Sequence, residues 1–170
     1  NLTRSLVLGL AIRTGVIKFI KHSETARMQF KLTYLSSVFA LVSDVALATY
    51  GGSLKRKETI SGRFADAFSW IYLASASLKR HSDGKEKGME PLLDWCVQTA
   101  CYNAHNALLG NIDNLPNPVS RFFVKILTSP LGLRFRFPGD KLMSTVAASI
   151  LDGDERREIL SISLMRVTLL

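Results

Sequence analysis

Leu47-Ala-Thr-Tyr-Gly-Gly-Ser-Leu-Lys-Arg-Lys-Glu-Thr-Ile-Ser-Gly-Arg63 joins two long segments of helical pattern and decides the fold. Two consecutive glycines, Gly51 and Gly52, give the backbone the left-handed freedom that ends one helix and reverses the chain. On both sides apolar residues recur every three or four positions, the period of an amphipathic helix. They are Met28, Leu32, Leu35, Phe39, Val42 and Ala46 before the glycines, and Ile60, Phe64, Ala67, Phe68, Ile71, Ala74 and Leu78 after them. We therefore predict an antiparallel helical hairpin.

The remaining sequence continues the helical pattern. A third long helix is predicted from residue 90, with Pro91 in its first turn, where a missing amide costs nothing. Leu133-Arg-Phe-Arg-Phe137 alternates like a strand but has no partner strand, so we expect an extended strap with Leu133, Phe135 and Phe137 pointing inward. The prediction is an all-α bundle of three long helices, at about residues 24–50, 54–80 and 90–109, plus short helices at 3–14, 119–127, 140–151 and from 155.

Length and composition indicate one globular domain. The chain has 170 residues, 47% of them hydrophobic and 21% charged, which suits a single core. We assign residues 1–157 to one helical domain and leave 158–170 as a terminal segment of uncertain structure. Because the first residue is Asn1, we expect the chain to be part of a longer one. Charges such as Arg13 and Lys18 interrupt the apolar runs, so no membrane-spanning helix is predicted.

The net charge of +8 is concentrated at one predicted end of the hairpin. An antiparallel hairpin brings the start of its first helix beside the end of its second, which forms one positive pole. A solvated rim and a contact with an anionic membrane surface both fit this pattern. Nucleic acid is not an expected partner, because the basic residues lack interleaved aromatics and no recognition motif is present. The pole comprises Lys21, Arg27, Lys31, Lys79, Arg80, Lys85 and Lys87.

Three motifs contain residue types that occur in functional sites, but they lack the number, geometry or spacing that such sites require. Cys101 and His105 share a helix face but are too few ligands for a metal. His81-Ser82-Asp83 has the residues of a catalytic triad without its geometry. The segment Gly51–Lys55 matches neither the P-loop nor the dinucleotide spacing. We therefore interpret the first motif as part of a packed helix, the second as a loop and the third as a turn. We predict no catalytic, cofactor-binding or metal site.

Two further predictions concern buried chemistry. Asp44 and Asp66 lie within apolar helices, and burial of an unpaired carboxylate is costly. We therefore predict that they form an ion pair with Arg63 or cap a neighbouring backbone end. Cys96 and Cys101 are five apart on one helix, where they face different directions and cannot form a disulfide. We expect both thiols to be reduced.

The hairpin sequence also resembles a known family. Leu47 to Asp66 and Tyr72-Leu-Ala-Ser-Ala-Ser-Leu-Lys-Arg80 look like the C-terminal extension of the large bacterial FAD-dependent acyl-coenzyme A dehydrogenases of fatty-acid β-oxidation. Leu93-Asp-Trp-Cys-Val-Gln98, Asn114-Leu-Pro-Asn117 and Pro138-Gly-Asp-Lys-Leu142 fit the same family in the same order. The resemblance covers about residues 4–157, and the pattern departs from the family after Arg157.

The resemblance implies a parent enzyme that uses FAD to introduce a 2,3-double bond into fatty acyl-CoA. Its catalytic glutamate and flavin site lie upstream, so no FAD is expected here, and Glu24, Glu58 and Glu90 stand in no catalytic motif. The implied partners are the dehydrogenase core of the same chain, a second subunit of a homodimer and a peripheral membrane surface. The implied location is the bacterial cytoplasm or the cytoplasmic face of the inner membrane. The alternative is a freestanding basic helical module that binds anionic membranes or a partner helix.

Overall fold

The computed structural model describes residues 24–83, 89–128 and 135–151, and within these ranges every regular element is helical. The predicted short helices at 3–14 and from 155 lie outside the described residues. Three long helices with shorter ones confirm the predicted all-α class. The elements are α3 (Glu24–Tyr50), the 3-10 helix η1 (Gly51–Arg56), α4 (Glu58–Ser82), α5 (Glu90–Asp113), α6 (Pro118–Thr128) and α7 (Asp140–Leu151).

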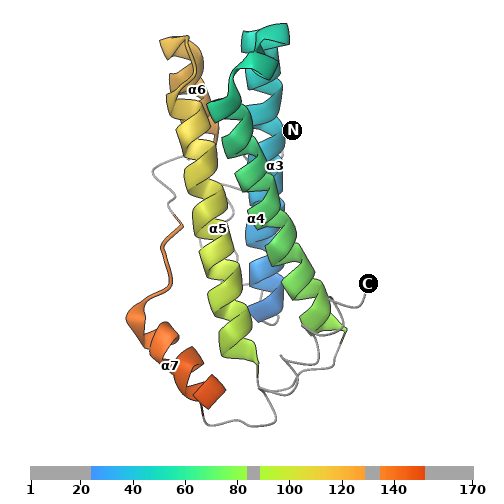
Figure 1. Ribbon diagram of the computed structural model, residues 1–170, viewed down its shortest axis with the longest axis vertical. Helices are drawn as coiled ribbons and strands as arrows, with labels where there is room; N and C mark the ends of the chain where they lie inside the picture. The colour runs from blue at the N-terminus through green and yellow to red at the C-terminus, as the bar shows by residue number, and fades with distance from the viewer. Residues whose placement is uncertain (1–23, 84–88, 129–134, 152–170) are drawn as a thin grey trace.

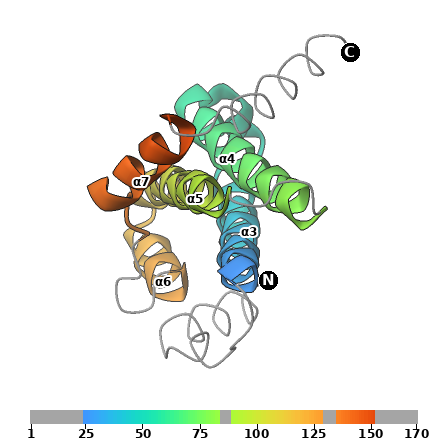
Figure 2. The ribbon, with the colours of Figure 1, turned by 90° about the horizontal axis from the view of Figure 1, so that it is seen from below.

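The three long helices form a bundle in which each contacts the other two (Figure 1). α4 packs more extensively on α5 than on α3, although α3 precedes it in the hairpin. The short helices α6 and α7 both contact α5, and Figure 2 shows α5 at the centre with the other helices around it. The centre of the molecule is therefore α5 as much as the hairpin.

The core follows the predicted helical faces with one exception. Tyr34, Leu35 and Val42 of α3 are completely buried, as is Ala67 of α4. Phe68, predicted to point inward, is 59% exposed. One helical step of about 100° separates it from Ala67, so its ring reaches only the edge of the interface, 6.1 Å from the ring of Phe39. The prediction for Phe68 was wrong because periodicity alone does not fix the edge of a buried face.

The chain reverses through η1 and not through the glycines alone. Gly51 has a φ of +51°, and the amide of Lys57 donates to the carbonyl of Leu54 at 3.0 Å. α4 consequently begins at Glu58, later than the predicted residue 54. α5 continues past its predicted end at residue 109 to Asp113, and the side-chain amide of Asn114 donates to the carbonyl of Gly110 at 2.7 Å. The 3-10 turn and this cap explain the two corrected boundaries.

The segment before α7 packs partly as predicted. The ring of Phe135 lies 6.2 Å from that of Tyr34 and 5.2 Å from that of His105, so it covers the core. Phe137 is 49% exposed, although its ring lies 5.5 Å from that of Tyr102. The inward prediction therefore holds for Phe135, fails for Phe137, and falls outside the described residues for Leu133.

Among the described residues, one helical stretch, Glu24–Arg56, is long and apolar enough to span a membrane. The prediction that no helix meets these criteria is therefore wrong, because the polar and charged residues within the stretch do not lower its mean hydropathy enough. A buried core helix satisfies the same criteria of length and composition, and α3 packs against both α4 and α5. Of its apolar window, 44% is buried inside the bundle.

Candidate functional site

The predicted basic pole is assembled in part from the described residues. One open groove is lined by Gln29 and Thr33 of α3 and by Lys79 and Ser82 of α4, so the start of α3 lies beside the end of α4. Arg27, Lys79 and Arg80 are exposed, and Lys31 is half-buried. Lys79 forms an ion pair with Asp83, with 2.7 Å between Nζ and Oδ1. Lys21, Lys85 and Lys87 lie outside the described residues.

Lys31 of α3 is half-buried. Burial raises the pKa of Cys101 to about 11, and the positive charge of Lys31 opposes this rise. Lys31 is therefore close enough to Cys101, on α5, to act on the thiol electrostatically. This geometry leaves Arg27, Lys79 and Arg80 as the described members of the pole that face outward.

The residues of the predicted ion pair are placed as follows. Asp44 and Asp66 are both exposed, and Arg63 is half-buried. The Cδ and Nε atoms of Arg63 lie 3.1 Å from the place where a Cβ of Gly110 would be. Arg63 thus packs on α5 at a point where the missing side chain makes room. The pairing of Arg63 with the two carboxylates stays a prediction.

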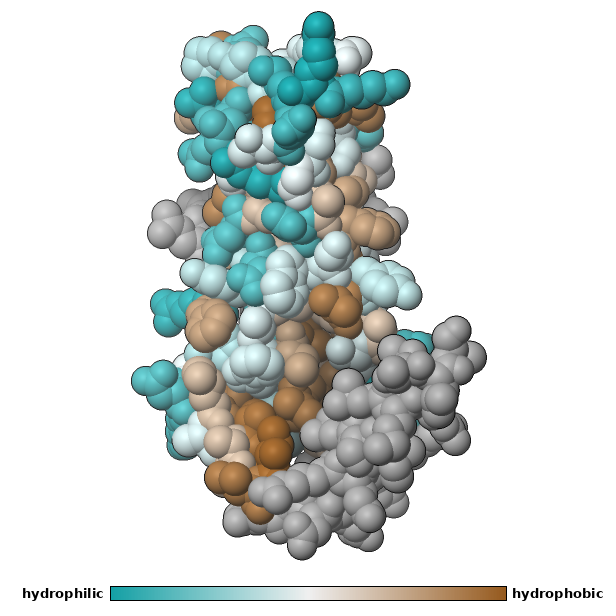
Figure 3. All heavy atoms as spheres, in the orientation of Figure 1, coloured by the Kyte–Doolittle hydropathy of each residue, from teal (hydrophilic) through white to brown (hydrophobic). Residues whose placement is uncertain are grey.

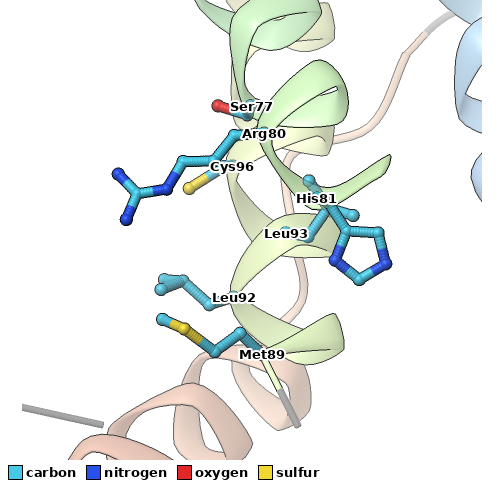
Figure 4. A pocket seen from close by; sticks show the side chains of 7 residues that line it. All are labelled: Ser77, Arg80, His81, Met89, Leu92, Leu93 and Cys96. Atoms are coloured by element: carbon cyan, nitrogen blue, oxygen red, sulfur yellow. The ribbon is translucent and has the colours of Figure 1, made fainter. Parts of the chain in front are cut away.

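A small pocket lies between the end of α4 and the start of α5 (Figure 4). Its volume is about 190 Å³, below the range of roughly 300–1,000 Å³ typical of small-molecule sites. Arg80, Met89, Leu92 and Cys96 point to one side, whereas the ring of His81 points away from them. Burial raises the pKa of Cys96, which disfavours its thiolate. The pocket therefore has a mainly apolar lining, and the raised pKa leaves little thiolate on Cys96 at neutral pH.

The residues considered above as catalytic or metal-binding candidates make structural interactions or are buried in the core. The hydroxyl of Ser82 donates to the carbonyl of Lys79 at 2.7 Å, and Asp83 is paired with Lys79. Cys101 and His105 are both buried in α5, and the described residues contain no group of three or more potential metal ligands. Both described cysteines are free thiols, as predicted.

The glycines of the bend do not form a phosphate-binding turn. Such a turn presents its amides to a phosphate at the start of an α-helix. Gly51 and Gly52 are instead the first two residues of the 3-10 helix η1, and an added Cβ at either would meet no atom within 4 Å. Glu24, Glu58 and Glu90 each occupy the first turn of a helix, where a carboxylate complements the helix dipole.

Two exposed apolar surfaces escaped the sequence analysis. On α4 they are Phe68, Tyr72 and Leu73; on α6 they are Val119, Phe122, Phe123 and Ile126, whose exposed fractions run from 47% to 62%. The orientation of α6 is the reverse of that expected for an amphipathic helix. Val124 and Thr128 are buried, and the side that bears most of its large apolar residues faces solvent. The sequence places the apolar residues of α6 on one side of the helix, but it does not show whether that side faces the bundle or solvent.

Comparison with known families identifies the chain. A sequence model described as "Acyl-CoA dehydrogenase, C-terminal, bacterial type" matches residues 1–167. The match extends beyond Arg157, into the terminal segment that the sequence analysis set apart. No solved structure matches the chain. A match over nearly the whole length shows that this chain belongs to the family of bacterial-type acyl-CoA dehydrogenase C-terminal domains.

Proposed function

We propose that this chain is the non-catalytic helical domain of a dehydrogenase that uses FAD to introduce a 2,3-double bond into fatty acyl-CoA. The supporting observation is the family match over residues 1–167. The site chemistry agrees with it, because the glutamates begin helices, the thiols are buried or half-buried, and the glycines form a turn. The domain supports the dehydrogenase core by packing against it.

The free cysteines support a reducing location for the parent enzyme. We propose the bacterial cytoplasm or the cytoplasmic face of the inner membrane. The exposed cations Arg27, Lys79 and Arg80 favour the second of these, because clustered basic residues are attracted to anionic lipid headgroups.

The catalytic part of the proposal is tested by a comparison of two proteins. This chain, supplied with FAD, a saturated fatty acyl-CoA and an electron acceptor, is expected to show no acceptor reduction. The intact dehydrogenase that contains it is expected to reduce the acceptor. Acceptor reduction by this chain alone would contradict the proposal. So would the lack of acceptor reduction by the intact protein.

The supporting role needs a second measurement. Deletion of residues 1–170 from the intact enzyme is expected to lower its melting temperature and its retention of FAD. If both were unchanged, the domain would not support the core.

The membrane contact is tested by sedimentation with anionic vesicles. Binding that is weakened by salt, and lost when Lys79, Arg80, Lys85 and Lys87 are changed to Ser, is the expected result. If binding did not depend on salt concentration, or if no binding occurred, the pole would be interpreted as a solvated rim of the protein.

A further inference from the structure

We draw no further inference here: the strongest candidate, the pair of exposed apolar surface patches on α6 and on the middle of α4 (Figure 3), carries no assignment, because nothing in the structure shows whether the dehydrogenase core, a second copy of the chain or a lipid surface covers either patch.

Discussion

The hydroxyl of Tyr34, in α3, donates a hydrogen bond to the backbone carbonyl of Thr128, the last residue of α6. Both residues are buried, and the carbonyls of a last helical turn lack partners within their own helix. Tyr34→Phe should therefore lower the free energy of unfolding by about 1–3 kcal/mol, measured by chemical denaturation. Tyr50→Phe is the control: its hydroxyl donates to the carbonyl of Asn114 at 2.6 Å in an exposed place, so the loss should be smaller. Equal losses would contradict the buried bond.

The same tyrosine predicts a loss of stability at alkaline pH. Burial raises the pKa of Tyr34 from 10.0 to about 12. Above pH 10 the unfolded chain releases this proton and the folded chain keeps it, so stability falls with pH. The contribution is intact below pH 10 and is lost between pH 10 and about 12, amounting to about 2–3 kcal/mol. Urea denaturation from pH 9 to 12 should show a steeper decline in the wild type than in Tyr34→Phe, and parallel declines would contradict the assignment.

Substitution by alanine should lower the stability of the protein by different amounts at the two glycines of the bend. Gly51 has a φ of +51°, whereas Gly52 does not have a positive φ, and neither has an atom within 4 Å of an added Cβ. Gly51→Ala should cost about 1 kcal/mol from backbone strain alone, while Gly52→Ala should be nearly neutral. The two melting temperatures provide the comparison, and an equal effect would show that the left-handed conformation at Gly51 is not required.

A second glycine pair separates helix propensity from packing. Gly62→Ala in α4 meets open space and should raise the free energy of unfolding by about 0.5–1 kcal/mol, because alanine favours helix. Gly110→Ala places a Cβ 3.1 Å from Arg63, so part of that gain should be lost. Adding Arg63→Ala to Gly110→Ala tests the contact through a double-mutant cycle. Additive effects would show that Arg63 and position 110 do not interact.

The two thiols should differ in reactivity. Cys101 is 1% exposed, and burial raises its pKa to about 11, so almost no thiolate is present at pH 8. Cys96 is half-buried and borders a pocket. Alkylation with iodoacetamide at pH 8, followed by peptide mass spectrometry, should label Cys96 first and Cys101 only after unfolding. Labelling of Cys101 first would contradict the packing of α5.

The helices themselves were predictable because their signals are local. Apolar residues at a spacing of three and four located α3, α4 and α5, and Asp140 to Leu151 was predicted with the boundaries that α7 has. Boundaries set by turn geometry were not predictable to the residue. The 3-10 conformation of Gly51–Arg56 delays the start of α4, and α5 continues through Gly110 to Asp113, where the side chain of Asn114 caps its end.

The sequence did not allow us to predict which helices pack against each other most extensively. An apolar face shows that a helix is buried but not against which neighbour, so the preference of α4 for α5 was missed. Phe68 and the apolar side of α6 were missed for a related reason, since a hydrophobic residue reads as core whether its partner is inside the domain or outside it. Antiparallel topology alone predicts that the start of α3 lies beside the end of α4. Contact of the basic pole with an anionic surface stays a prediction.

The exposed triplet Lys55-Arg56-Lys57 lies where the chain crosses from α3 to α4. Trypsin cleaves after such residues when they are accessible, and α4 is retained chiefly by its contacts with α5. A single cut there would leave two polypeptides bound to each other without a covalent link. The bend is accordingly the place to split this domain into complementing halves or to insert a reporter.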